Sequence, residues 1–140
     1  MQNQVLLSCF TALAASFIYA GSLGASGLSC SKRQCSKAFA DELKKAEAGD
    51  ASAQNRVGEM LHFGEGVQQD YLAAKEWYLK ATNGGHAVAP NHLGRLFLNG
   101  EGVAKDSAEA CRWYKISADR GDAAGEYNFA RCAHDGEPRS

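Results

Sequence analysis

Side chains that could perform catalysis or bind a metal are few in this chain, and their spacing matches no active-site pattern. The four histidines are His62, His86, His92 and His134. No two of them have the spacing of a zinc-protease or related catalytic motif. Cys30 and Cys35 could supply two metal ligands, but no second pair follows at zinc-site spacing. We therefore predict no metal ion and no cofactor.

Two aspartates and a glycine turn are explained by helix geometry rather than by catalysis. Asp70 and Asp106 each precede a predicted helix, where an aspartate accepts hydrogen bonds from the first free backbone N–H groups. The Gly-Glu-Gly turn at 64–66 follows a predicted helix and lacks the Lys-Ser/Thr ending of a phosphate-binding loop. The chain is therefore predicted not to be an enzyme.

The composition leaves room for one domain and argues against a nucleic-acid partner. The chain has 140 residues, with 15 lysines and arginines against 16 aspartates and glutamates. Because no run of basic residues stands out, the chain lacks the positive surface that binding to nucleic acid needs. We predict no nucleic-acid partner.

Residues 1–29 form a separate segment at the start of the chain. No aspartate, glutamate, lysine or arginine precedes Lys32, and the stretch 5–20 is mostly apolar, followed by small residues at 21–27. This pattern predicts a cleaved signal peptide and export to the periplasm or the medium. The alternative is an uncleaved membrane anchor formed by residues 1–28, because about 20 mostly apolar residues can span a bilayer.

A repeat of 36 residues organises the rest of the chain. Gly49, Gly85 and Gly121 recur at this interval, which also separates the Trp-Tyr pairs at 77–78 and 113–114. A repeat of this length indicates stacked supersecondary units, none of which can bury its apolar face alone.

Each unit is predicted to consist of two helices joined by a glycine turn. The predicted segments are an N-terminal capping helix at 30–48, repeat 1 at 49–84, repeat 2 at 85–120 and a partial repeat 3 at 121–140 that forms the C-terminal cap. This division predicts six helices after the first segment. The fold class is all-α, a short α-solenoid of helix-turn-helix repeats with half-repeat caps.

Two glycines lie in the middle of predicted helices. At Gly58 and Gly94, glycine costs about 1 kcal/mol relative to alanine. A cost that recurs in both repeats requires a packing reason. We predict that the second helix of each repeat crosses close to the glycine, with Ala74 and Ala110 at the contact.

The remaining cysteines bear on how the last helix is held. If the signal segment is removed before Cys30, the cysteines left are Cys30, Cys35, Cys111 and Cys132. An even number in an exported chain is compatible with two disulfides, and three pairings are open. Cys111 and Cys132 lie on adjacent predicted helices, so we predict a bridge between them that clamps the last helix. The alternative is that both are small buried hydrophobic residues.

The two full units resemble the Sel-1-like repeat, a branch of the tetratricopeptide superfamily. The matching residues of repeat 1 are Ala51-x-Ala53, Val57-Gly58, Gly64-Glu65-Gly66-Val67-x-x-Asp70 and Ala74-x-x-Trp77-Tyr78. Repeat 2 follows the same pattern, and the resemblance covers about residues 49–136. It implies a right-handed α-solenoid that serves as an interaction scaffold, and its bacterial members are often exported.

The resemblance also implies where a partner would bind, because the first helix of each repeat lines the concave face in this family. The positions expected to point outward there, and to bind the partner, are Asn55, Glu59, His62, Asn91, Arg95, Leu98, Tyr127 and Arg131. Asn55 and Asn91 are identical in an otherwise variable row, and an amide can both donate to and accept from a peptide backbone. The alternative is that these are solvated polar positions.

Two functions remain open on this basis. The first is a non-catalytic, exported protein-interaction module, an adaptor or an immunity-like inhibitor, that binds a protein or peptide on its concave helix face. The second is a structural subunit or assembly factor of a cell-envelope complex, held at the membrane by residues 1–28.

Overall fold

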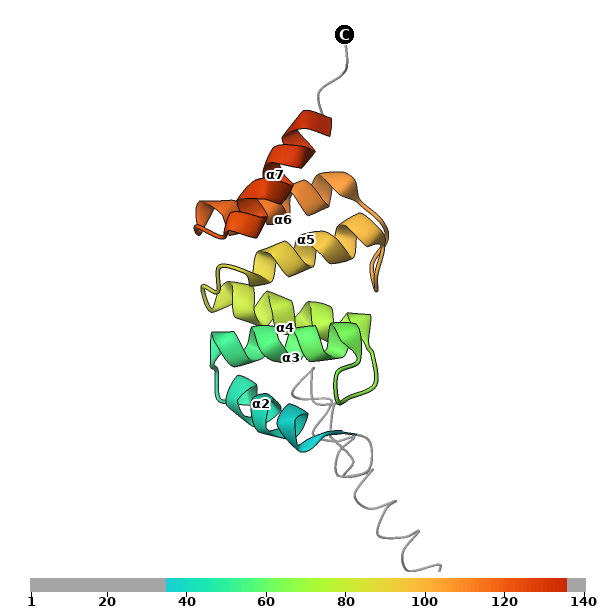
Figure 1. Cartoon of the computed structure of the whole chain (residues 1–140), viewed down its shortest axis with the longest axis vertical. Helices are drawn as coiled ribbons and strands as arrows, with labels where there is room; N and C mark the ends of the chain where they lie inside the picture. Colours follow the sequence, from blue (N-terminus) through green and yellow to red (C-terminus); the bar gives the residue numbers. More distant parts are fainter. Residues whose placement is uncertain (1–34, 136–140) are drawn as a thin grey trace, which may run out of the picture. The chain divides into compact units, whose positions relative to one another are not determined.

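The computed structural model describes residues 35–135, which form a stack of α-helices (Figure 1). The helices are α2 (Lys37–Glu47), α3 (Ala51–Phe63), α4 (Tyr71–Asn83), α5 (Ala89–Asn99), α6 (Ser107–Asp119) and α7 (Ala123–Asp135). Within this part of the chain there is no β-strand. The predicted all-α class and the predicted six helices are confirmed.

Some expectations concern residues outside the described range. The predicted signal or anchor segment at 1–29, the start of the capping segment at 30–34 and the last residues, 136–140, all lie there. In the described part of the chain, none of the helices has the length and apolar character needed to cross a bilayer.

Aspartates cap the starts of α3, α4 and α6, and those of α4 and α6 are at equivalent positions of the two repeats. The Asp50 carboxylate accepts hydrogen bonds from the backbone N–H groups of Ser52 and Ala53 at the start of α3. Asp70 and Asp106 each accept one such hydrogen bond at the starts of α4 and α6, from the backbone N–H of the third helix residue, Ala73 and Glu109. These contacts satisfy backbone donors that no earlier turn of the helix can reach.

The turn between the two helices of a repeat has the same backbone path twice. Gly64 and Gly100 end α3 and α5 in the left-handed conformation, each with φ of 71°. The N–H of Asp70 then donates to the carbonyl of Leu61, and the N–H of Asp106 donates to that of Phe97, both at 2.9 Å. Each turn is therefore tied back to its first helix before the second begins.

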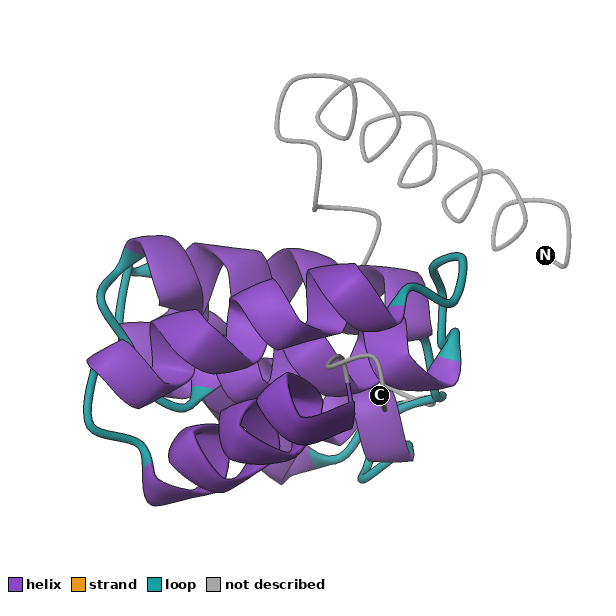
Figure 2. Cartoon of the chain, turned by 90° about the horizontal axis from the view of Figure 1, so that it is seen from above, coloured by secondary structure: helices purple, strands orange, loops and turns teal. Residues whose placement is uncertain are grey.

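Each helix packs mainly on the helices before and after it in the chain. The pairs run in order from α2 on α3 to α6 on α7, and α7 also contacts α5. Figure 2 shows the connecting loops gathered at the ends of the helices. Such nearest-neighbour packing is the defining property of a repeat solenoid, in which each unit is stabilised by the one beside it.

The mid-helix glycines lie beneath tyrosine rings. A β-carbon built on Gly58 would lie 2.6 Å from the ring of Tyr78, and one built on Gly94 would lie 2.5 Å from the ring of Tyr114. The predicted close crossing at the glycines is confirmed. The predicted contact residues, Ala74 and Ala110, are wrong, because the tyrosine of each Trp-Tyr pair takes the space that the absent side chain leaves.

A disulfide joins the last two helices. It links Cys111 of α6 to Cys132 of α7, whose Cα atoms are 5.7 Å apart. Cys35 is also disulfide-bonded, and Cys30 lies outside the described residues. The bridge holds α7 against α6 in addition to their packing contacts.

The glycine–tyrosine contact gives a stability prediction. Gly94→Leu should lower the free energy of unfolding by about 1–3 kcal/mol or more, because a branched side chain would displace the Tyr114 ring. Thermal unfolding followed by circular dichroism measures the change. The matched control is Ala130→Leu, at the equivalent position of α7, where the side chain is exposed; it should change stability by no more than about 0.5 kcal/mol. Equal midpoints for Gly94→Leu and the wild type would contradict the packing described above.

Candidate partner-binding face

The predicted binding residues occupy equivalent turns of three helices. Asn55, Glu59 and His62 lie on α3; Asn91, Arg95 and Leu98 on α5; Tyr127 and Arg131 on α7. Helices α3, α5 and α7 are the first helices of successive units. Their side chains divide into a buried group, which joins one repeat to the next, and a group that reaches solvent.

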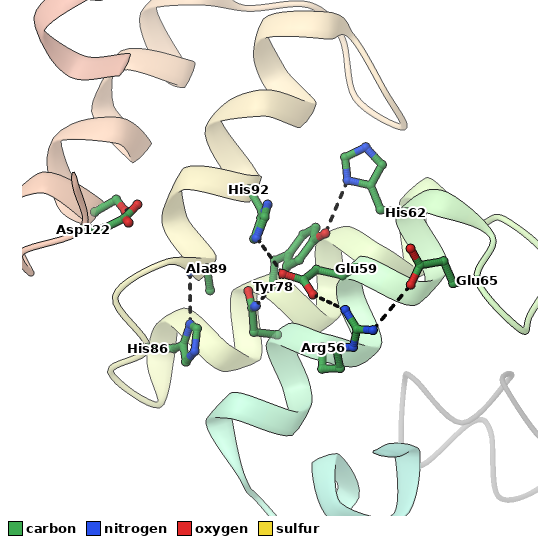
Figure 3. Close-up of polar contacts among 11 residues, drawn as sticks. Arg56, Glu59, His62, Glu65, Tyr78, His86, Ala89, His92 and Asp122 are labelled. Atoms are coloured by element: carbon green, nitrogen blue, oxygen red, sulfur yellow. Dashed lines mark hydrogen bonds and ion pairs between the residues drawn. The ribbon is translucent and has the colours of Figure 1, made fainter. Parts of the chain in front are cut away.

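Glu59 belongs to the group that joins the repeats. Its carboxylate lies 3.1 Å from Nε2 of His92 on α5 and 3.0 Å from a guanidinium nitrogen of Arg56 (Figure 3). Because a carboxylate only accepts, the His92 Nε2–H must donate. This hydrogen bond, helped by Arg56 and opposed by partial burial, lowers the pKa of Glu59 to about 2. Glu59 is therefore ionised at neutral pH and ties α3 to α5.

His62 is buried in the same inter-repeat space, with 3% of its surface exposed. Its Nε2 lies 3.0 Å from the carboxylate of Glu101. Its Nδ1 lies 3.3 Å from the Tyr78 hydroxyl, as Figure 3 shows. Burial lowers the pKa of His62, although Glu101 opposes the shift. In the neutral ring, Nε2–H donates to Glu101 and Nδ1 accepts from Tyr78, so both ring nitrogens are occupied.

The two asparagines do not point outward as expected. Asn55 and Asn91 are 7% and 6% exposed. The amide of Asn55 donates to Glu59 at 3.2 Å, and the oxygen of Asn91 accepts from Asn128 of the next unit at 2.8 Å. The physical reason is that Asn91 is bonded by Asn128 of α7, and that Asn55 shares the Glu59 carboxylate with His92 of α5. Like His62, which is also buried, they are engaged in contacts within the stack.

The remaining predicted residues reach solvent. Arg131 and Tyr127 are exposed, the latter at 65%, and Arg95 and Leu98 are half-buried. The Arg95 guanidinium lies 5.6 Å from the ring centre of Phe63, and that of Arg131 lies 5.8 Å from the ring centre of Tyr127. Among the described residues neither arginine has a carboxylate partner. We call these five residues, Phe63, Arg95, Leu98, Tyr127 and Arg131, the arginine face.

Phe63 was absent from the sequence-based set. It ends α3 and is 50% exposed, so it is one of the few large apolar side chains that the described surface presents to water. Its position one residue after His62 places it at the edge of the predicted row. An apolar aromatic residue directly before a glycine turn was the signal that could have identified it.

A pocket opens beside the arginine face, between α5, α6 and α7. Its volume is about 380 Å³, within the range of small-molecule sites, about 300–1,000 Å³. The lining residues are Leu98, Ser107, Ala108, Cys111, Tyr114, Asn128, Arg131, Cys132 and Asp135. Leu98 and Arg131 of the predicted set therefore share this pocket with the disulfide.

The described part of the chain contains no cluster of histidine, cysteine, aspartate or glutamate side chains arranged to hold a metal ion. Some of its buried polar groups instead bond between neighbouring repeats, as His62 does to Glu101. The arginine face offers cationic and aromatic surface, which is suited to binding another molecule.

Comparison with known families decides what kind of repeat this is. Residues 51–86 and 87–122 each match the Sel1 repeat model. The chain belongs to the Sel1 repeat family. The matched units have the 36-residue length expected from the glycine spacing and begin two residues after the predicted ones. Sel1 repeats are protein-interaction modules.

Solved structures of Sel1 repeat proteins resemble the fold. One is a Sel1 repeat protein from Oxalobacter formigenes, 30% identical with a TM-score of 0.63; the match covers 71% of this chain and 44% of that one. Another is a protective antigen of uropathogenic Escherichia coli strains with an SLR fold, 27% identical with a TM-score of 0.69, covering 89% of this chain and 25% of that one. This chain thus spans less than half the length of either. Among curated proteins, no similar sequence was found.

The buried His62 gives a pH prediction. Because its pKa is lowered in the folded protein, the unfolded chain binds more protons just below the ordinary value of about 6.5. Its contribution to stability is therefore complete above about pH 6.5 and is lost as pH falls through the folded pKa. The midpoint temperature of thermal unfolding should decrease as the pH is lowered from about 7.5 to about 5.5, a range in which Glu59 stays ionised.

His62→Gln should make the unfolding midpoint depend less on pH over this range, with the dependence that remains coming in part from His86, whose pKa burial also lowers. The control is His134→Gln, because the His134 side chain is 84% exposed. If His62→Gln and His134→Gln have the same pH dependence, the His62 ring does not titrate differently in the folded and unfolded chains.

Proposed function

We propose that this Sel1 repeat protein is an exported, non-catalytic adaptor or inhibitor that binds one partner protein through the arginine face. The observation that carries this proposal is that two arginines on this face, Arg95 and Arg131, contact aromatic rings and have no carboxylate partner among the described residues. Other arginines of the stack are already engaged. Arg56 and Arg112, for example, pair with Glu59 and Glu109.

The composition of the face supports binding to a protein. Arginine and tyrosine are enriched among the residues that contribute most to protein–protein affinity, because each combines large contact area with directional hydrogen bonds. Arg131 lies beside Tyr127 of its own helix, and Arg95, at the equivalent position of α5, lies beside Phe63 of the preceding unit. An exposed guanidinium can hold a carboxylate through two parallel hydrogen bonds. The face therefore favours a partner surface that carries acidic residues.

A lack of catalysis is consistent with the state of the histidines. Both ring nitrogens of the buried His62 are hydrogen-bonded, to Glu101 and to Tyr78. Nε2 of His92 is held by Glu59, whereas its buried Nδ1 has no hydrogen-bond partner among the described residues. Three of the four ring nitrogens therefore serve the stack. The glutamates are in turn held by these rings. Breaking these contacts to carry out chemistry would separate adjacent repeats.

Charge reversal tests the face. The full chain, tagged and purified, captures its partner from the envelope fraction of the native cell, and the affinity of that partner is then measured for each variant. Arg95→Glu combined with Arg131→Glu should weaken binding by about 100-fold or more, with the helical circular-dichroism signal unchanged.

The control makes the same change of charge on the opposite helices. Arg112→Glu combined with Lys115→Glu alters exposed residues of α6 and should leave the affinity within a few-fold of wild type. If the α6 variant loses binding while the α5 and α7 variant keeps it, the partner binds the second helices and the proposed face is wrong.

Export is tested by the N-terminus of the mature protein. Sequencing of the protein recovered from the periplasm or the medium should find a first residue between about Leu23 and Cys30, since small residues at 21–27 follow the apolar stretch. Recovery of the chain with Met1 intact in the membrane fraction would instead favour the membrane-anchored subunit.

A further inference from the structure

The two spaces between successive repeats differ in what fills them. In the first, the His62 ring lies edge-on to Tyr71 at 5.5 Å and edge-on to Tyr78 at 6.2 Å. The Tyr78 ring also stacks on His92 at 4.9 Å. Four rings from α3, α4 and α5 thus meet around one point, and Glu101 closes the group through its bond to His62.

In the second space, three of those four rings are missing. Moving each position forward by one repeat of 36 residues places Leu98 for His62, Ser107 for Tyr71 and Asn128 for His92, whereas Tyr114 retains the aromatic ring of Tyr78. Leu98, Ser107, Asn128 and Tyr114 all line the pocket of about 380 Å³. The pocket is therefore the space that aromatic side chains occupy one repeat earlier.

Two parts of the pocket lining are held in place by contacts between helices. The Cys111–Cys132 disulfide forms part of the lining and joins α6 to α7. Tyr114, buried at 2% exposure, forms another part and is held in place by its contact with Gly94. The covalent link fixes the separation of α6 and α7 at this wall of the pocket.

One positive and one negative side chain lie at this pocket. Arg131 lines it and belongs to the arginine face, and Asp135 lies one helical turn further along α7. The structure shows no ion pair between them, although Asp135 has a weak contact with His134. The guanidinium of Arg131 lies near the Tyr127 ring and has no ion pair with any residue of 35–135, so it can bind a carboxylate of a ligand.

We infer that this pocket receives a bulky apolar side chain from the partner protein, and that an acidic residue next to that side chain binds Arg131. The inference rests on the proposed function and specifies the partner segment: a leucine, methionine or aromatic residue flanked by aspartate or glutamate. The chain's own side chains in the first space show which shapes fit, and the unpaired Arg131 determines the charge beside them.

The probe is a peptide selected on the immobilised full chain from a random displayed library, then synthesised with a fluorescent label. Enriched peptides should share a bulky apolar residue beside aspartate or glutamate. Their affinity is measured by fluorescence anisotropy against the wild type and the variants below.

Ser107→Tyr fills the pocket with the residue that the protein already uses at the equivalent position, Tyr71. Both are the first residues of their helices, α6 and α4, so the variant should fold. It should weaken peptide binding by about tenfold or more, because the apolar side chain of the peptide is left in water. The matched control is Leu72→Tyr, which adds an aromatic ring at an exposed position of α4 and should not change the affinity.

Should Ser107→Tyr unfold, Ala108→Trp blocks the pocket from an exposed position of its lining and replaces it in the test. Arg131→Glu should also weaken binding of the selected peptide, and a version of that peptide with lysine for its acidic residue should bind the Arg131→Glu variant better than it binds the wild type. This reversal would place the acidic residue next to Arg131.

The possible results distinguish the inference about the pocket from the proposed function of the arginine face. If the selected peptides carry no apolar residue, or bind Ser107→Tyr and Ala108→Trp as tightly as the wild type, the pocket inference is overturned. If, in that case, binding of the native partner still depends on Arg95 and Arg131, the proposed function stands without the pocket. If the native partner is indifferent to those arginines as well, both are wrong.

Discussion

The contact on which the stack depends is a tyrosine ring seated on a glycine. Gly58 and Gly94 have no side chain, so Tyr78 and Tyr114 come closer to the partner helix than a β-carbon would permit. Each contact sets the separation of two helices within a repeat. The tyrosines are almost fully buried, and large buried aromatic side chains contribute much of the apolar area that such a repeat removes from water. The cost of a glycine inside a helix, about 1 kcal/mol, is offset by this packing.

The same tyrosines face the space between repeats. Tyr78 stacks on His92 of the following helix, and its hydroxyl donates to Nδ1 of His62, so a single residue joins α3, α4 and α5. Tyr114 occupies the equivalent position but lines a pocket instead. The difference lies in the residues around the ring rather than in the backbone, because both turns and both glycine contacts repeat closely. The same backbone arrangement thus gives a space filled by aromatic side chains around Tyr78 and an open pocket around Tyr114, one repeat later.

Much of this architecture could be predicted from the sequence. The period of the glycines predicted the number of helices, and Asp70 and Asp106 were identified as caps because their chemistry is local. The partner of Gly58 was missed, since Ala74 and Tyr78 are four residues apart and lie on the same face of one helix, and spacing alone cannot tell which of them reaches the crossing. The burial of Asn55 and Asn91 was also missed, because it depends on how closely adjacent repeats approach. That distance is set by packing between repeats, which no local pattern in the sequence encodes.

The distribution of polar groups then explains why the arginine face lies toward the later repeats. Residue 59 on α3, the first helix of repeat 1, is a glutamate, and its carboxylate is hydrogen-bonded by His92 and Arg56. The equivalent positions of the next two units are Arg95 and Arg131. An arginine cannot accept a hydrogen bond, so neither can form the bond that Glu59 forms with the following unit. The position equivalent to His92 is correspondingly Asn128, which bonds Asn91 instead. Because an arginine replaces the glutamate at positions 95 and 131, these side chains do not form the bond that joins successive units. Their guanidinium groups lie near exposed rings instead, where a partner can reach them.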